Sequence, residues 1–280
     1  MSELFTLEHA GSFGGELKGR VQLPEQSGAR PTVIICHGFK GFMDWGFFPP
    51  LADLLCERGF AVVRFNYSGS GMQPGDELVG DLEAFKRNTF SLELAETLRV
   101  LTSTQDLAPG RIDTQRMALL GHSRGGGAAI LAAAAPEWRQ RLRALVTWAS
   151  VATFDRYALE AREAWRRDGA LPMVNGRTGQ QLQLGVELLD DVEENRQRLD
   201  LESAAANRQS PWLIVHGAAD ETVPEAEART LYEAAGAEKA LEIIAGGSHT
   251  FGAKHPFAGP TRELIQAMNA TQRWLRRHLV

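Results

Sequence analysis

The chain has 280 residues, of which 44% are hydrophobic and 23% charged, and its formal net charge is −5. This length supports one large hydrophobic core with room for an inserted subdomain. The acidic balance and the lack of a basic stripe argue against binding to nucleic acid or to an anionic membrane surface, and no apolar run approaches the length that spans a bilayer.

Eight short segments are predicted to be strands. The first two, residues 4–9 and 17–23, alternate apolar and polar residues, as half-exposed antiparallel edge strands do. The other six are nearly continuous apolar runs, at residues 32–36, 61–65, 117–120, 145–148, 212–215 and 241–244. Helical patterns lie near residues 48–58, 82–103, 124–135, 225–235 and 260–279. This alternation predicts an α/β fold, a mostly parallel eight-stranded sheet flanked by helices on both faces, with the active site at the carboxyl ends of the strands.

The segment between residues 148 and 212 interrupts this alternation, because it is too long for a simple crossover. It contains a charged helical pattern at 155–168, an Asn175-Gly176 pair that favours a hairpin turn, and an acidic helical pattern at 186–198. We expect residues 1–152 and 209–280 to form the core and residues 153–208 to form a lid over the strand ends. The alternative is a surface decoration away from the site.

The sequence Gly121-His122-Ser123-Arg124-Gly125 joins the apolar run at 117–120 to a helical run of small residues. Gly-x-Ser-x-Gly between a strand and a helix is typical of a nucleophile elbow, where a strained backbone exposes the serine hydroxyl at the positive end of the helix. The glycines leave room for the strand and helix to approach each other. Ser123 is therefore the candidate nucleophile.

A serine nucleophile needs a base to accept its proton, and in this architecture the base follows the serine in the chain. His249 lies in a loop of small residues just after an apolar strand, which can place an imidazole over a strand end. We favour it over His255, in a looser stretch before a proline, and over His278, two residues from the C-terminus.

The base needs an acid to orient it. Asp220 lies on the loop between the strand at 212–215 and the helix near 225, at the same edge of the sheet. Asp155, after the preceding strand, is the other topological option. Glu221 is adjacent to Asp220, and we expect its side chain to point elsewhere.

The tetrahedral oxyanion of acyl transfer needs two backbone N–H donors. We expect one from Arg124, which follows the nucleophile, and one from Phe39, in the loop after the first buried strand. We also expect Phe42 and Trp45 to line a substrate pocket, with core packing as the alternative.

The remaining polar patterns predict no further chemistry. His37 is expected to be structural, because it precedes the serine and a base is already available, and the same holds for His122 and His216. The sequence contains neither Cys-x-x-Cys nor His-Glu-x-x-His, so it implies no metal and no cofactor. Cys36 and Cys56 fall in apolar elements and are expected to be buried free thiols. Buried free thiols fit a reducing cytoplasm, and we see no signal-peptide pattern at the N-terminus, so we expect a cytoplasmic protein.

These features resemble the α/β-hydrolase superfamily over essentially the whole chain. The resemblance is carried by His37-Gly38-Phe39, the elbow, Asp220–Pro224 and Ser248-His249. The chain is most similar to bacterial serine esterases of the cinnamoyl/feruloyl-esterase and serine-aminopeptidase-like group, which share the His-Gly-Phe sequence and a lid between the same strands. Dienelactone hydrolases use a cysteine at the elbow and haloalkane dehalogenases an aspartate, so Ser123 argues against both.

The resemblance implies a serine carboxylesterase in which Ser123, His249 and Asp220 act as nucleophile, base and orienting acid. Its partner would be an ester of small to medium size, hydrolysed through an acyl-enzyme. A thioesterase, peptidase or acyltransferase with the same triad is the main alternative, followed by a different reaction on the same scaffold, such as carbon–carbon bond hydrolysis. A non-catalytic small-molecule binder is the alternative from another class. The chain is expected to be a monomer or a homodimer.

Overall fold

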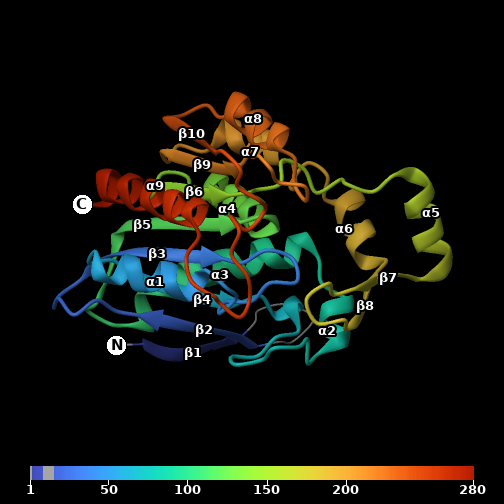
Figure 1. The fold of residues 1–280 in the computed structure, drawn as a ribbon, viewed down its shortest axis with the longest axis horizontal. Coiled ribbons are helices and arrows are strands. Elements are labelled where there is room, and N and C mark those ends of the chain that lie inside the picture. The colour runs from blue at the N-terminus through green and yellow to red at the C-terminus, as the bar shows by residue number, and fades with distance from the viewer. Residues whose placement is uncertain (1, 9–15) are drawn as a thin grey trace.

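The computed structural model describes residues 2–8 and 16–280. Its centre is an eight-stranded sheet in the order β1-β2-β4-β3-β5-β6-β9-β10 (Figure 1). The strands are β1 (Ser2–Glu8), β2 (Glu16–Gln22), β3 (Arg30–Cys36), β4 (Ala61–Asn66), β5 (Ile112–His122), β6 (Leu142–Trp148), β9 (Trp212–Gly217) and β10 (Lys239–Ile244). β2 pairs antiparallel with β1 and β4, and all other neighbours in this sheet are parallel. The predicted sheet is confirmed; the end of its first predicted strand, residue 9, lies outside the described residues.

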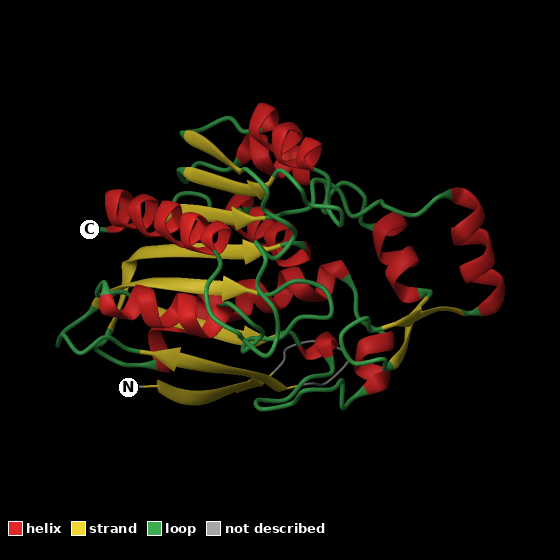
Figure 2. Cartoon of the chain, viewed as in Figure 1, coloured by secondary structure: helices red, strands yellow, loops and turns green. Residues whose placement is uncertain are grey.

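Helices cover both faces of the sheet, as Figure 2 shows. Val33 and Ile35 of β3 belong to the hydrophobic cluster that includes α1 (Phe48–Glu57) and α9 (Arg262–Leu279). Ile34 belongs to the opposite cluster, which includes α3 (Phe90–Leu107), α4 (Arg124–Ala134) and α8 (Glu225–Ala234). Successive strand residues point to opposite faces, so a continuous apolar strand is what a sheet covered on both sides requires.

The helix predicted over residues 82–103 is instead two helices, α2 (Leu82–Lys86) and α3. The break has a local cause: Thr89 has extended backbone angles, and its hydroxyl accepts a hydrogen bond from the N–H of Leu92 (3.1 Å). A threonine in this position caps a new helix. The short helical turn η1 (Ser68–Ser70) precedes α2 in the chain. The break places Phe90 at the first turn of α3.

The segment between β6 and β9 projects from the carboxyl edge of the sheet (Figure 1). It contains α5 (Leu159–Asp168), a two-stranded antiparallel sheet of β7 (Ala170–Val174) and β8 (Gln181–Gly185), α6 (Glu187–Glu194) and α7 (Leu201–Asn207). α7 packs on α4 and α8 of the core. That residues 153–208 act as a lid remains a prediction.

The hairpin in this segment is longer than a two-residue Asn-Gly turn. The carbonyl of Asn175 accepts hydrogen bonds from the N–H groups of Thr178 (3.2 Å) and Gly179 (2.8 Å). Its side-chain oxygen also accepts from the N–H of Arg177 (3.1 Å), so Asn175 opens the turn through its own side chain. The positive φ of 72° falls on Gly179 and not on the Asn-Gly pair.

Both cysteines are free and buried. Burial raises the pKa of each thiol, Cys36 and Cys56, to about 12. Neither is a reactive thiolate at neutral pH. Within the described residues, no helix is long and apolar enough to cross a membrane.

Candidate active site

Ser123 stands at the junction of β5 and α4 in a strained conformation, with φ of 56° and ψ of −123°. A non-glycine residue with positive φ costs on the order of 1–3 kcal/mol and persists only where its surroundings hold it. Hydrogen bonds hold this one on both sides: its N–H donates to Trp148 O and its carbonyl accepts from Gly126 N, each at 2.9 Å. The turn is therefore pinned between β6 and the first turn of α4.

The two glycines of the elbow have no space for a side chain. A Cβ on Gly125 would lie 2.2 Å from the carbonyl oxygen of His37, and one on Gly121 would lie 2.3 Å from the carbonyl oxygen of Gly125. Both distances are far inside van der Waals contact with backbone that cannot move independently. The Gly-x-Ser-x-Gly spacing thus reflects how closely β3, β5 and α4 approach one another.

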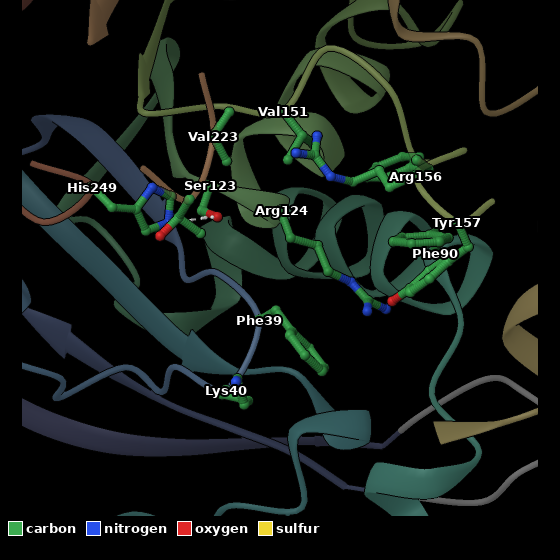
Figure 3. A pocket seen from close by; sticks show the side chains of 12 residues that line it. Phe39, Lys40, Phe90, Ser123, Arg124, Val151, Arg156, Tyr157, Val223 and His249 are labelled. Carbon is green, nitrogen blue, oxygen red and sulfur yellow. Dashed lines mark hydrogen bonds between the residues drawn. The ribbon is translucent and has the colours of Figure 1, made fainter. Parts of the chain in front are cut away.

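The structure brings Ser123, Asp220 and His249 together. His249 Nε2 lies 3.0 Å from Ser123 Oγ, and His249 Nδ1 lies 2.9 Å from Asp220 Oδ2. Figure 3 shows the imidazole and the hydroxyl side by side at one end of a cavity. With its Nδ1 proton donated to the carboxylate, the imidazole presents Nε2 as the acceptor for the serine hydroxyl. These are the contacts that nucleophilic activation of a serine requires.

The loops that carry the acid and the base touch each other. Asp220 follows β9 and His249 follows β10, two neighbouring parallel strands. The N–H of Ala219 donates to the carbonyl of Gly247 (2.9 Å), and a Cβ on Gly217 would lie 2.1 Å from that same oxygen. Small residues after both strands therefore let the two loops cross closely enough for the side chains to meet.

Asp220 is fully buried as a side chain and is surrounded by donors. Its Oδ1 accepts from the N–H groups of Thr222 and Val223, each at 2.9 Å, and His216 Nε2 lies 3.3 Å from its Oδ2. Burial alone would raise the pKa of this carboxyl, but the hydrogen bonds from His216, His249 and Val223 outweigh it and hold the pKa well below its usual range. Asp220 therefore stays a carboxylate at neutral pH.

The rival acids and bases lie away from the serine. Glu221 is exposed at the surface beside Asp220. The other three have charged partners of their own: Asp155 pairs with Arg162, His255 with Glu77, and His278 with Glu238. In the part of the chain that the structure describes, none of these four interacts with Ser123 or His249.

The two residues predicted to form the oxyanion hole border the nucleophile. A Cβ on Gly38 would lie 2.9 Å from Ser123 Cβ, so the loop after β3 runs directly against the elbow. Phe39 follows in that loop, and Arg124 is the first residue of α4, whose N–H has no acceptor within its own helix. Both line the same cavity as Ser123 and His249. Their role as oxyanion donors remains a prediction.

The cavity at Ser123 has a volume of about 340 Å³ (Figure 3). It is lined by Phe39, Lys40, Phe90, Ser123, Arg124, Val151, Phe154, Arg156, Tyr157, Thr222, Val223 and His249. Trp45 lines a smaller adjoining cavity of about 130 Å³, which also reaches Ser123. Phe42 lines neither cavity; it is buried edge-on against His255, with Arg177 over its ring.

Sequence reasoning missed much of the cavity wall. Phe90 comes from α3, while Phe154, Arg156 and Tyr157 come from the start of the insertion. Among the wall residues without a predicted role, Lys40, Thr222 and Val223 carried a signal, because they lie in the loops already assigned to Phe39 and to Asp220. The other wall residues carry no local pattern that marks them.

Three buried histidines support the site without reaching the serine. His37 Nε2 accepts from the N–H of Tyr67 (3.1 Å), and His122 Nε2 lies 3.0 Å from the carbonyl oxygen of His249, which ties the elbow to the loop of the base. His216 Nε2 lies 2.9 Å from Val223 O. Burial lowers the pKa of His37 to about 4 and that of His122 to about 3. Both are therefore neutral at physiological pH.

We expect the free energy of unfolding to decrease between about pH 7 and pH 5, in part because of His37. Its pKa is about 4 in the fold against an ordinary value of 6.5. In the window between these values the unfolded chain binds more protons, so stability present above pH 6.5 is lost as the pH falls. One such histidine contributes a loss of about 2 kcal/mol over this interval.

Urea denaturation at the two pH values measures this loss. The His37→Gln variant should lose about 2 kcal/mol less than the unmodified chain. The remaining titratable groups are common to both proteins, so the difference isolates His37. An equal loss in the two proteins would contradict the expectation.

A model of the alpha/beta hydrolase family matches residues 33–266. The chain is 26% identical to the "Uncharacterized 31.7 kDa protein in traX-finO intergenic region" of Escherichia coli over 304 aligned positions, which cover 97% of this chain and 99% of that protein.

Two solved structures are similar in fold. One is the esterase domain of a Rhodothermus marinus protein, with a TM-score of 0.67 and 19% identity over 100% of both chains. The other is Est1E from Butyrivibrio proteoclasticus with ferulic acid bound, with a TM-score of 0.70 and 20% identity over 94% of this chain and 96% of that one. At these identities the likeness concerns the fold.

Proposed function

We propose that this chain, which belongs to the alpha/beta hydrolase family, is a serine carboxylesterase that cleaves small to medium esters through an acyl-enzyme on Ser123. One observation carries the proposal: an unbroken line of hydrogen bonds runs from Asp220 through His249 to Ser123, with lengths of 2.9 and 3.0 Å. A hydroxyl at the apex of a strained turn, in contact with an oriented imidazole, is suited to nucleophilic attack.

Acylation begins when Ser123 Oγ attacks the ester carbonyl carbon and its proton passes to His249 Nε2. The electron pair of the carbonyl moves to its oxygen, where the N–H groups of Phe39 and Arg124 stabilise the negative charge. The tetrahedral intermediate then collapses, the carbon–oxygen bond to the alcohol breaks, and His249 Nε2 returns the proton to the departing oxygen. The acyl group of the substrate remains bound to Ser123 Oγ as an ester.

Deacylation repeats these steps with water. His249 Nε2 removes a proton from a water molecule, which attacks the acyl carbon, and the same two N–H groups stabilise the second oxyanion. Collapse breaks the bond to Ser123 Oγ, which regains its proton from His249. Throughout, the Asp220 carboxylate holds the imidazole in orientation and stabilises its protonated form without itself accepting the proton.

The names of two similar structures support an ester, in place of a thioester or an amide, as the substrate. Two proteins of similar fold are named as an esterase domain and as Est1E with ferulic acid bound. The cavity at Ser123 has the largely apolar wall, with a few polar groups, that small-molecule sites have. A panel of matched oxyester, thioester and aminoacyl amide substrates separates this proposal from a thioesterase or a peptidase.

Covalent labelling with a fluorophosphonate probe tests the nucleophile directly. We expect a single adduct, located by peptide mass spectrometry at Ser123, because the probe reacts only with an activated serine. The heat-unfolded chain, in which His249 no longer meets Ser123, is the control and should not be labelled. A folded chain that stays unlabelled, or an adduct on another serine, would refute the proposal and favour a non-catalytic binder.

A further inference from the structure

The side chain of Arg124 lies inside the cavity that Ser123 opens into. It runs from the elbow away from the serine, toward Phe90 and Tyr157, as Figure 3 shows. Its guanidinium carbon lies 4.1 Å from the centre of the Phe90 ring. The side chain is only 8% exposed, so its positive charge lies on the buried wall of the cavity. Because the side chain is extended (Figure 3), the guanidinium is separated from Ser123 by about the length of an arginine side chain.

The guanidinium of Arg124 is only partly hydrogen-bonded. Its Nε donates to Glu93 Oε2 (2.8 Å), and Glu93 Oε1 in turn accepts from the side-chain amide of Asn88 (2.9 Å). Its Nη2 is buried and has no hydrogen-bond partner within the described part of the chain. A buried charged donor without an acceptor is strongly unfavourable, so such a group indicates that an acceptor is supplied from elsewhere.

The charged groups on the otherwise largely apolar cavity wall are all cationic. Lys40, Arg124 and Arg156 line it, and none of its described lining residues is an aspartate or a glutamate. Arg156 is engaged by Glu227 at 2.7 Å, and Lys40 is exposed to solvent. Arg124 is therefore the cation best placed to meet a ligand away from water, where a charge-assisted hydrogen bond is strongest.

A purely structural role explains only part of this arrangement. The ion pair with Glu93 joins α4 to α3, which accounts for Nε of Arg124. The rings of Phe90 and Phe39, whose centres lie 4.1 and 5.4 Å from the guanidinium carbon, help to hold the group in place. Neither contact supplies an oxygen acceptor for the buried, unpartnered Nη2. Glu93 and Asn88 instead fix the orientation of the fork, as supporting residues do for a binding group.

We propose that the esters this site hydrolyses carry a carboxylate, and that the guanidinium of Arg124 binds this carboxylate at the end of the cavity away from Ser123. The inference rests on the proposed esterase function. A planar carboxylate matches the planar guanidinium group in shape. Because Glu93 already partly neutralises Arg124, a ligand with a single negative charge fits better than one with two. The carboxylate can belong to the acid or to the alcohol of the ester, and the two sources are separated by experiment.

Two pairs of substrates test the inference by comparing kcat/KM for an anionic ester with that for a neutral ester of the same shape. In the first pair, mono-4-nitrophenyl adipate carries the carboxylate on the acid, and 4-nitrophenyl 6-methylheptanoate replaces it with an isopropyl group. In the second, the butyrate esters of 3-hydroxybenzoate and of 3-isopropylphenol place the same difference on the alcohol. We expect a preference for the anionic ester of about 10-fold or more in one pair.

The Arg124→Met variant should lower the ratio of anionic to neutral kcat/KM by about 10- to 100-fold, the range of a charge-assisted hydrogen bond. Absolute rates are not the readout, because Arg124 also supplies a proposed oxyanion donor. Arg156→Met is the matched control, an arginine on the same wall, and should change the ratio by less than about threefold if recognition is local. Should Arg124→Met fail to fold because Glu93 loses its partner, the double variant Glu93→Gln/Arg124→Met removes both charges and gives the same ratio.

The outcomes separate this inference from the function on which it rests. Ser123-dependent hydrolysis of the neutral esters, with a ratio near one in both pairs or a ratio unchanged by loss of Arg124, overturns the inference and leaves the esterase standing. An equal fall of the ratio in Arg156→Met also overturns it, because the effect is then one of general charge. If no ester in either pair is hydrolysed, both proposals fail together.

Discussion

Replacing Ser123 with alanine should lower kcat/KM for 4-nitrophenyl butyrate by about 10⁵- to 10⁶-fold, the loss that follows removal of a serine nucleophile that acts with a histidine base. The alanine retains the cavity and the oxyanion donors but has no oxygen that can attack the carbonyl. His249 loses the hydroxyl whose proton it accepts, and it can then activate water only weakly. Steady-state kinetics with the purified variant measure the effect.

The control for this substitution is Ser203→Ala. Ser203 lies in the first turn of α7, where its hydroxyl donates to Asp200 (2.7 Å), far along the chain from the elbow. Its loss should leave kcat/KM unchanged. Turnover by Ser123→Ala within tenfold of the unmodified chain would show that the hydrolysis does not proceed through this hydroxyl, and the acyl-enzyme mechanism would have to be abandoned.

Replacing Asp220 with asparagine should lower kcat by about 10⁴-fold. The amide has nearly the shape of the carboxylate, so the contacts with Thr222 and Val223 can persist on its oxygen. Its NH₂ group, however, faces His249 Nδ1 at a position where the carboxylate accepts (2.9 Å). The imidazole would then carry its proton on Nε2, where it cannot accept one from Ser123, and its charged form would lose its stabilising anion.

Two other carboxylates, Glu221 and Asp155, provide matched controls for Asp220. Glu221→Gln removes the adjacent charge, and Asp155→Asn removes the acid that was the other topological option. Neither should change kcat by more than about threefold, as is usual for exposed charges away from the reacting atoms. A loss in Asp155→Asn as large as that in Asp220→Asn would reassign the orienting acid. Because the Asp220 side chain is fully buried, the asparagine variant tests the contact with His249 and not a change of surface charge.

The parts of the molecule that sequence predicted well are those fixed locally. The predicted eight-stranded sheet and the resemblance to the alpha/beta hydrolase family are both confirmed. The elbow could be recognised because its strand, turn and helix are contiguous, and the loops of Asp220 and His249 could be placed because each directly follows a strand whose end must lie at the active edge. The prediction of which three side chains meet used the chain order of serine, acid and histidine and the position of each residue just after a strand.

The parts that could not be predicted depend on contacts between distant segments. Phe42 and Trp45 are both aromatic and nearly adjacent, yet only Trp45 borders Ser123, because Phe42 packs against His255 and beneath Arg177. Phe90 reaches the cavity because one threonine ends a helical pattern that otherwise looks continuous. No periodicity in the sequence predicts which aromatic side chain lines the cavity. The outcome depends on contacts with residues more than a hundred positions away, or on a single capping side chain.

The same limit applies to Arg124. In the sequence it occupies an unspecified position of the Gly-x-Ser-x-Gly pattern. The sequence predicted a role for its backbone N–H and none for its side chain. The structure gives its side chain a place on the cavity wall, held by Glu93 from α3. Whether an arginine at this position points into a cavity, into the core or into solvent is decided by α3 and the insertion, which local pattern does not relate to the elbow.

The glycines that begin α4 have a consequence for how the protein is made. There are three, Gly125, Gly126 and Gly127, and they pack against His37, Ser150 and Phe154 respectively. The start of α4 is therefore held by one segment that precedes it and by another that follows β6. Glycine is a poor helix former, and this stretch has little tendency to coil alone. A nascent chain that has left the ribosome only as far as α4 therefore contains Ser123 but lacks the later residues, Ser150 and Phe154, against which the start of α4 packs. The elbow therefore depends for its shape on residues that are synthesised after α4.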